Sequence, residues 1–527
     1  MLDSFFQRAL LAGVTGLLYP LAFPDFDWSL AGWIALLPLL LATDGSRPRE
    51  AFWLGWIAGT IAFVGVMFWV ITAMHLYGGV SLVISAGLMV LLSLYLGLYA
   101  AAFAAVFTWL RKQVPWLAFL AAPFLWVSLE LARTYLLTGL PWGLIGYTQY
   151  RALPVIQIAD HTGIYGISFL VVLVNAALAE AVIWAWARAN RITVREFPWV
   201  TPTAAIAALF VTLVYGYVQL SATRSDPTGP TTGRARTLAI GLVQANIDQA
   251  RKWDETYLNE TLERYRRLTE QVAPDTDLVI WPEAATPFLF EHEPLYRGEV
   301  RQLVRSQGVP LLFGSPALRY HANGRPYLLN SAYLLTPDGD ILGRYDKRHL
   351  VPFGEYIPLR TLLFFVDKLV KGIGDFEPGH TPALLSVPPA GEPGQTDDPM
   401  HPPGEGRSVK FGVAICYEVI FPTLVRESVR QGADFMVTIT NDAWFGRTTA
   451  PFQHFGMVVL RAVENRVSFA RAANTGVSGF IDPYGRILDT TPIFTMQGVR
   501  GTIPIRSDTT FYTKFGDVFA YTCAIIT

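Results

Sequence analysis

The chain has 527 residues and a formal net charge of −1, with 41 Lys and Arg against 42 Asp and Glu. This balance excludes the basic composition typical of nucleic-acid binding, and a 52% hydrophobic content excludes a disordered chain. Only 19 of the first 223 residues are charged, against 64 of the remaining 304. Since soluble domains are about 25% charged, the composition predicts a membrane part followed by a globular domain.

We predict a membrane domain of seven helices over residues 1–220, because one crossing needs about 20 apolar residues. The apolar segments are 5–23, 28–43, 51–73, 79–110, 115–133, 163–187 and 199–220. The first lacks a small-x-small motif, which favours a span over a cleaved signal peptide. A linker is expected at 221–236. The segment 507–527 is a candidate eighth crossing, but its apolar stretch at 515–527 is short and looks incomplete.

Cationic residues gather in alternate loops of this membrane part. Eight belong to one set of loops: Arg8, Arg47, Arg49, Arg111, Lys112, Arg188, Arg191 and Arg195. Two, Arg133 and Arg151, belong to the other set. Because Lys and Arg resist translocation, we expect a cytoplasmic N-terminus, with residues 221–510 on the opposite face. In a bacterium, this is a multi-pass protein of the cytoplasmic (inner) membrane whose globular domain faces the periplasm.

Residues 237–506 alternate short apolar runs with helix-like segments. Strands are expected at 237–246, 277–283, 309–315, 408–418 and 434–442, and hairpins at 330–347 and 477–490. Helices are expected at 255–272, 295–307, 423–433 and 453–466. This alternation of strands and helices, with inserted hairpins, predicts an α/β layered fold.

Two segments depart from the alternation. Residues 386–408 are rich in Pro and Gly, which predicts a surface loop, to which we assign no role. Residues 359–374 are amphipathic and strongly apolar. They form either a core helix or an arm that dips into the bilayer surface and guides acyl chains.

Three chemically active side chains stand at predicted strand ends. Glu283 ends one strand, Lys347 ends the first hairpin, and Cys416 ends a third run. Functional groups of α/β sheets gather beyond the carboxyl ends of strands, so these three could converge in one crevice. A thiol is mostly protonated at neutral pH, and Glu283 can take its proton. Lys347 and backbone N–H groups, including that of Tyr417, can stabilise an oxyanion, which gives acyl transfer through a thioester.

Other chemistries find less support in the sequence. The two cysteines, Cys416 and Cys523, provide no disulfide framework. His349 lies near Lys347, so a dyad of Cys416 with His349 is an alternative arrangement. No H-E-x-x-H, C-x-x-C, G-x-G-x-x-G after a strand, or P-loop pattern occurs, so we expect no metal and no cofactor.

Four motifs carry a resemblance to a known family. They are WPEAATP (281–287), RYDKRHLVPFGEYIP (344–358), GVAICYEVIFP (412–422) and TNDAWFG (440–446). These resemble the motifs of the nitrilase superfamily, and membrane spans on both sides narrow the resemblance to apolipoprotein N-acyltransferases. The resemblance implies an eight-span membrane part and an αββα-sandwich nitrilase-like domain outside the cytoplasmic membrane.

The resemblance also implies a reaction. An acyl chain passes from a membrane phospholipid to the N-terminal amine of a diacylglyceryl-modified cysteine in an apolipoprotein, by a ping-pong mechanism with a thioester intermediate. The partners are then a phospholipid donor, an apolipoprotein acceptor and the lipid bilayer, with no nucleic acid, and we expect a monomer. Glu283 is implied as general base, Lys347 as transition-state stabiliser and Cys416 as nucleophile.

Five further residues match positions of the family motifs. Glu355 matches a glutamate that positions the lysine, and Tyr417 and Glu418 flank the nucleophile. Trp253 and Trp444 match aromatic positions near the substrate cleft.

Two rival functions use the same sequence features. A membrane-tethered amidase would have identical catalytic residues and would hydrolyse its thioester with water. A transporter or receptor with an inactive outer domain would need polar residues within its spans, where Glu130 and Glu180 are the main cases.

Overall fold

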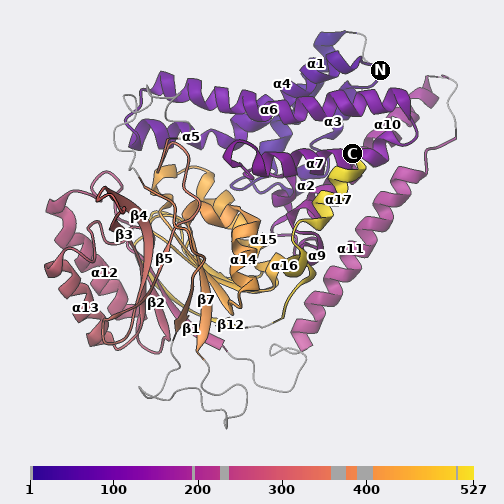
Figure 1. The fold of residues 1–527 in the computed structure, drawn as a ribbon. Helices are drawn as coiled ribbons and strands as arrows, with labels where there is room; N and C mark the ends of the chain where they lie inside the picture. Colours follow the sequence, from indigo (N-terminus) through magenta and orange to yellow (C-terminus); the bar gives the residue numbers. More distant parts are fainter. Residues whose placement is uncertain are drawn as a thin grey trace.

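The computed structural model describes residues 4–190, 192, 196–225, 237–357, 376–387, 408–505 and 508–527. The predicted arm at 359–374, most of the 386–408 loop and most of the 221–236 linker lie outside these residues. Two bodies are visible in Figure 1, a bundle of long helices and a layered domain that contains the strands. The division follows the predicted change in composition.

The helical body contains five helices, among the described residues, that are long and apolar enough to cross a membrane. They lie within α4 (Pro48–Met67), α6 (Leu82–Gln113), α7 (Ala118–Tyr135, with the turn to Thr138), α10 (Ile164–Ala189) and α11 (Val200–Ser225). The first predicted span forms α1 (Phe5–Leu21), which has 17 residues. The second divides into α2 (Ser29–Gly32) and α3 (Leu37–Ala42), where Pro38 occupies the first turn of α3. Proline is tolerated there because it lacks an N–H that a helix interior would need.

The C-terminal apolar stretch forms α16 (Phe511–Phe515) and α17 (Val518–Ile526). At nine residues, α17 is shorter than a full crossing. The number of crossings, seven or eight, therefore stays a prediction.

Small residues bring α4 and α6 together. A Cβ on Gly59 of α4 would lie 2.9 Å from Gly97 Cα of α6, so the two backbones are close at this point. Close packing of small residues is a common way for helices to associate in a membrane, where no hydrophobic effect drives them together. In Figure 1, α4 and α6 accordingly run along one another.

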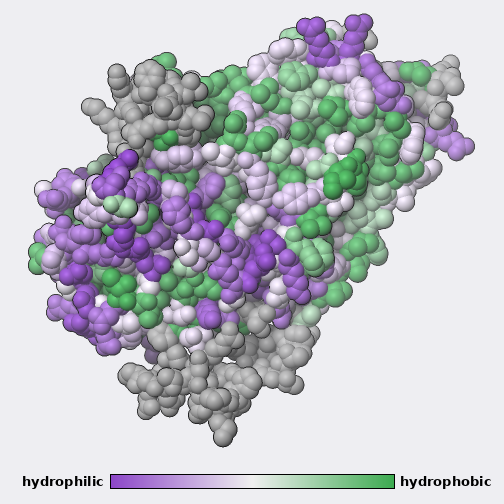
Figure 2. Space-filling model, in the orientation of Figure 1, coloured by the Kyte–Doolittle hydropathy of each residue, from purple (hydrophilic) through white to green (hydrophobic). Residues whose placement is uncertain are grey.

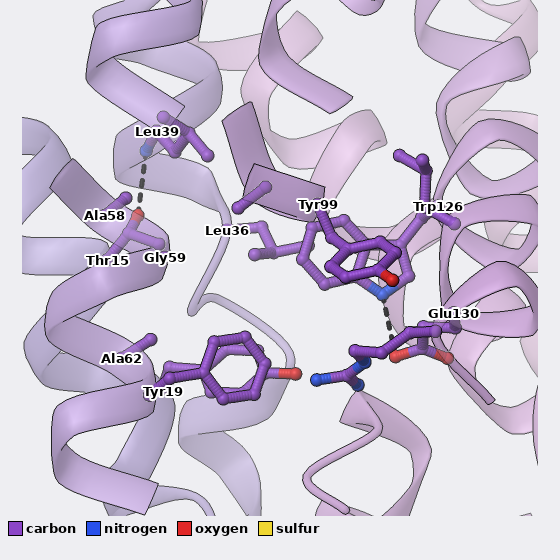
Figure 3. Close-up of a pocket in the computed structure, with 14 residues that line it drawn as sticks. Thr15, Tyr19, Leu36, Leu39, Ala58, Gly59, Ala62, Tyr99, Trp126 and Glu130 are labelled. Atoms are coloured by element: carbon purple, nitrogen blue, oxygen red, sulfur yellow. Dashed lines mark hydrogen bonds between the residues drawn. The ribbon is translucent and has the colours of Figure 1, made fainter. Parts of the chain in front are cut away.

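A cavity of about 30 Å³ lies between α1, α3, α4, α6 and α7 (Figure 3). Most of its lining is apolar, but one end contains Glu130 and Arg133, each only 3% exposed. Glu130 Oε1 accepts hydrogen bonds from Trp126 Nε1 at 2.9 Å and from Ile145 N at 2.8 Å. Glu130 therefore holds in place the loop that follows α7. This loop lies close to the globular domain.

The described residues of the globular domain form two six-stranded sheets. The first has the order β12–β1–β2–β3–β4–β5, with bounds Gln497–Pro504, Thr237–Gln244, Leu278–Ile280, Leu311–Tyr320, Pro326–Leu335 and Ile341–Asp346. The second has the order β11–β10–β9–β8–β7–β6, with bounds Ile487–Thr490, Gly479–Ile481, Ser468–Ala473, Phe435–Thr440, Val409–Ile415 and Leu384–Val387. Apolar side chains of both sheets form one core, which includes Leu242, Leu312, Phe411 and Val437.

Helices cover the outer face of each sheet. α12 (Leu258–Val272) and α13 (Pro294–Gln307) pack on the first sheet, and α14 (Pro422–Arg430) and α15 (Ala450–Asn465) on the second. The α/β layered prediction is confirmed, because the two sheets and their outer helices form an αββα sandwich.

The two helical layers of the sandwich differ in environment. α12 has a charged outer face with Arg266 bonded to Glu263 and Glu270, and Figure 2 shows hydrophilic side chains over this region. α15 is almost wholly buried, because it lies between its sheet and the membrane body. Hydrophobic side chains dominate the surface of the membrane body in Figure 2. α15 thus joins the two bodies through a continuous apolar core.

Candidate active site

The three residues predicted at strand ends are brought together by the two sheets. Glu283 follows β2 after a short loop, Lys347 follows β5 directly, and Cys416 follows β7 directly. Glu283 and Lys347 both interact electrostatically with the Cys416 thiol. A carboxylate, an ammonium and a thiol from the two sheets therefore share one site.

Lys347 is shared between two carboxylates. Its Nζ donates to Glu355 Oε1 at 2.9 Å and to Glu283 Oε1 at 3.4 Å, and the side chain is 1% exposed. Burial alone would lower the pKa of Lys347, but Glu355 and Glu283 reverse this effect and raise it. Lys347 therefore stays an ammonium at neutral pH. Asn330 Nδ2 donates to the same two Oε1 atoms at 2.8 Å and fixes the spacing of the carboxylates.

The remaining oxygens of the two carboxylates bind backbone N–H groups. Glu283 Oε2 accepts from Asn441 N at 2.9 Å, and Glu355 Oε2 accepts from Val351 N at 2.8 Å. These bonds hold both carboxylates in place, so the position predicted for Glu355 beside Lys347 agrees with the geometry. Asn330 and Asn441 were not predicted as site residues.

Cys416 lies in a strained turn at the end of β7. Its φ of 52° is in the left-handed region, which is uncommon for a residue with a side chain. Burial raises the pKa of the Cys416 thiol, the Glu283 charge raises it further, and Lys347 opposes both. The resting group is therefore a thiol, and a base must remove its proton before it can attack. The side chain is only partly buried, so a substrate can reach it.

Glu418 connects the nucleophile turn to the lysine segment. It is fully buried, and its Oε2 accepts from Ile415 N at 2.7 Å. Its Oε1 accepts from Arg348 N at 2.7 Å and from Tyr345 OH at 2.9 Å. One carboxylate thus fixes the residue before Cys416 and the residue after Lys347 in a common frame.

A second lysine, not predicted from the sequence, lies in the site. Lys252 is 2% exposed, and its Nζ donates to the backbone O of Glu283 at 3.1 Å. Burial lowers the pKa of Lys252 to about 8, although the Glu283 charge opposes this effect. The sequence offered one indication that Lys252 belongs to the site, its position beside Trp253 in QANIDQARKW (244–253). Nothing in the sequence indicated that Lys252 is buried.

The predicted aromatic residues lie toward the membrane body or the solvent. Tyr417 OH donates to Gly139 O of the membrane body at 3.3 Å, and the Trp444 ring lies 6.0 Å from that of Tyr77. Trp253 follows Lys252 and is 52% exposed. The nucleophile turn therefore meets the membrane body through Tyr417, and Trp444 contacts it nearby.

The alternative dyad of Cys416 with His349 is not supported by the geometry. The His349 ring packs on Phe421, with centroids 3.9 Å apart. Burial, with a smaller effect of Lys347, lowers the pKa of His349 to about 4, so this imidazole is neutral at pH 7. Within the described residues, no group of three His, Cys, Asp or Glu side chains is arranged to hold a metal ion.

Comparisons with known proteins match both bodies of the chain. Residues 15–177 match the family model of the apolipoprotein N-acyltransferase N-terminal domain, and residues 239–505 match that of carbon-nitrogen hydrolases. The chain is 42% identical over 517 residues to the apolipoprotein N-acyltransferase of Geobacter metallireducens, which covers 98% of this chain and 92% of that protein. It is 32% identical over 524 residues to that of Pasteurella multocida, covering 98% and 93%.

Among solved structures, an amidase from Nesterenkonia sp. is 20% identical, with a TM-score of 0.34, covering 55% of this chain and 96% of that one. The two family models and the relatives that match along nearly the whole chain agree with one another. This chain is a multi-pass membrane enzyme that belongs to the apolipoprotein N-acyltransferase family.

Proposed function

We propose that the enzyme transfers a fatty acyl chain from a membrane phospholipid to the α-amino group of the N-terminal diacylglyceryl-cysteine of apolipoproteins, through a thioester on Cys416. One observation carries the proposal. The partly buried Cys416 shares its site with Glu283 and with a lysine held by two carboxylates, at the boundary with an apolar helical body.

In the first half-reaction, Glu283 accepts the Cys416 proton and the sulfur attacks the ester carbonyl of the phospholipid. The S–C bond forms, and the carbonyl oxygen becomes an oxyanion beside Lys347 and the Tyr417 N–H. The C–O bond to the glycerol then breaks. Glu283 returns the proton to the departing alkoxide, and a lysophospholipid leaves. Removing the thiol proton is demanding because the Cys416 pKa is raised, so this step depends on the position of Glu283.

In the second half-reaction, the acceptor amine takes the place of the lysophospholipid. Its nitrogen attacks the thioester carbonyl, Glu283 accepts the amine proton, and the same oxyanion donors act again. The C–S bond breaks, an amide forms, and the proton returns to Cys416. Lys347 keeps its charge throughout, since the carboxylates of Glu355 and Glu283 raise its pKa.

The location of the site suits lipid-anchored substrates. Each buried CH₂ group holds a lipid in the bilayer by about 0.8 kcal/mol, so neither substrate leaves the membrane readily. Tyr417 and Trp444 contact the membrane body, so the nucleophile lies close to it. We further propose that this face is periplasmic, in accord with the distribution of Lys and Arg in the loops.

The test is a product assay in detergent micelles. The purified chain is incubated with a phospholipid whose acyl chain is labelled and with a synthetic peptide that begins with diacylglyceryl-cysteine. We expect labelled N-acyl peptide, and we expect a matched peptide with a blocked α-amine to remain unlabelled.

Release of labelled free fatty acid, with no labelled peptide at any peptide concentration, would contradict transfer and favour the amidase alternative. Cys416→Ser is the control for the nucleophile. A serine hydroxyl is much harder to deprotonate, so that variant should form neither product.

A further inference from the structure

A buried histidine contacts the backbone of the nucleophile. His454 of α15 is 1% exposed, and its Nε2 lies 3.2 Å from the backbone O of Cys416. A carbonyl oxygen can only accept, so His454 Nε2 carries a proton and donates it. The imidazole therefore binds the main chain of the nucleophile and leaves its thiol free.

The Nδ1 side of this imidazole faces an ion pair: with the proton on Nε2, Nδ1 accepts from Arg471, which in turn is bonded to Asp442. His454 Nδ1 lies 3.0 Å from Asp442 Oδ1 and 3.0 Å from Arg471 Nη2. Arg471 Nη2 also donates to Asp442 Oδ2 at 2.8 Å, and both residues are fully buried. Burial alone would raise the pKa of Asp442, but Arg471 and His454 lower it to about 2, so it stays ionised.

We propose that His454 is a positioning residue that sets the direction of the oxyanion donor. The peptide group between Cys416 and Tyr417 is planar, so its carbonyl and the Tyr417 N–H point in opposite directions. A hydrogen bond from His454 to the carbonyl therefore fixes where the N–H points. Cys416 has a φ of 52°, a conformation that its own side chain disfavours. Surrounding contacts such as this hydrogen bond are needed to hold the backbone in that conformation. The inference rests on the proposed function, in which Tyr417 N–H binds the oxyanion.

The membrane body supports His454 from the other side. The loop 139–145, here termed the seam loop, places the Trp142 ring 5.7 Å from that of His454. Trp142 Nε1 donates to Gln453 Oε1 at 2.6 Å, next to His454 in α15. In the same loop, Gly143 O accepts from Tyr19 OH at 2.9 Å and from Arg133 Nη2 at 3.2 Å. Tyr19 lines the cavity of Figure 3, so contacts run from the membrane helices to the nucleophile.

The test compares two reactions of Cys416. Acylation by phospholipid passes through an oxyanion, whereas alkylation by iodoacetamide forms an S–C bond with loss of iodide and passes through none. In His454→Phe, the ring is kept and the donor is lost. We expect the rate of acylation to fall about 10- to 100-fold, below the cost of deleting an oxyanion donor outright. The alkylation rate and the KM for phospholipid should stay within about threefold of those of the unchanged chain, a shift too small to count as a lost contact.

Two amide variants refine the test, and they also serve if His454→Phe does not fold. The side-chain amide of His454→Gln reaches about as far as Nε2 and should recover most of the acylation rate. The shorter amide of His454→Asn reaches about as far as Nδ1 and should not. Trp142→Ala removes the ring that supports His454. In this variant the acylation rate should fall about 3- to 10-fold, and the alkylation rate should not fall with it.

Equal losses of acylation and alkylation in these variants would overturn the proposal, since they would indicate general damage to the site. Acylation at the original rate in both His454→Phe and His454→Asn would overturn it as well. Because alkylation needs neither the lipid nor the acceptor, this experiment can fail independently of the proposed function.

Discussion

Glu418 and Lys252 are the two site residues whose burial has the clearest energetic consequence. Glu418 acts only as an acceptor, for three backbone N–H groups and the Tyr345 hydroxyl. Lys252 is a buried ammonium whose hydrogen bond goes to a backbone carbonyl. Hydrogen-bond donors therefore compensate the burial of the Glu418 charge. The cost of removing the Lys252 ammonium from water is offset only in part.

Glu418→Gln is expected to cost about 2 to 4 kcal/mol of stability and most of the activity, because hydrogen bonds to a charge are lost and an amide NH₂ meets N–H donors. Denaturant unfolding and the transfer assay measure the two effects. Glu427→Gln is the matched control, since Glu427 accepts from Arg348 Nη1 at 2.8 Å nearer the surface. An active Glu418→Gln enzyme of unchanged stability would contradict the role of Glu418 as a clamp.

Lys252→Met is expected to change how stability depends on pH. The folded pKa of Lys252, about 8, lies below its ordinary value of 10.5. Between these values the unfolded chain binds more protons, so raising the pH stabilises the folded enzyme. Relative to Lys252→Met, the unchanged enzyme should gain at most about 3 kcal/mol over this range. Thermal unfolding of both proteins at matched pH measures the difference. A constant difference from below pH 8 to above pH 10.5 would show that the pKa of Lys252 is not lowered.

The sequence singles out Glu283, Lys347 and Cys416 because each follows an apolar run, and such runs mark strands; their catalytic roles stay a prediction. It does not predict Lys252 or Asn441, because their importance comes from contacts distant in the chain. Asn330 left a weak signal, as a polar residue at the start of an apolar hairpin strand. Burial of a single polar side chain depends on tertiary packing, which periodicity does not encode.

At the scale of elements, the loop that carries Glu283 is supported by β3. A Cβ on Gly314 would lie 2.5 Å from Ala284 N and 2.7 Å from Glu283 Cα. Gly314→Ala should therefore push Glu283, the proposed general base, away from the thiol and lower the acylation rate by about 100-fold, as a shift of roughly 1 Å can do.

Gly298→Ala in α13 is the matched control. Apart from the adjacent backbone of α13 itself, nothing lies within 4 Å of a Cβ there, and alanine stabilises a helix interior by about 1 kcal/mol. Single-turnover acylation compares the two variants. If Gly314→Ala were as active as Gly298→Ala, the close approach of β3 to Glu283 would be unimportant.

The elements themselves were predictable to different degrees. Apolar composition located the membrane segments, but length alone did not show that 28–43 forms two short helices, Ser29–Gly32 and Leu37–Ala42. The layered order of the globular domain followed from the alternation of strands and helices. The near-complete burial of α15 did not, because the face of α15 that points away from its sheet is covered by the membrane body.

At the scale of the molecule, the predicted orientation has a direct test. Asn323 in the globular domain and Lys112 in the last turn of α6 are both exposed. In a chain without its own cysteines, Asn323→Cys should react with a membrane-impermeant maleimide added from the periplasmic side, and Lys112→Cys should react only after the inner membrane is opened. The loop charges require this pattern. The reverse pattern would place the globular domain in the cytoplasm.

The central claim, that Cys416 carries the acyl group, is tested most directly by intact-mass measurement. The enzyme is incubated with a single defined phospholipid and no acceptor, then denatured in acid. We predict a mass increase equal to one acyl group, located on the peptide that contains Cys416, which hydroxylamine removes and which the acceptor peptide discharges. An acyl group on any other residue, or an adduct on Cys416 that the acceptor fails to discharge, would contradict the account.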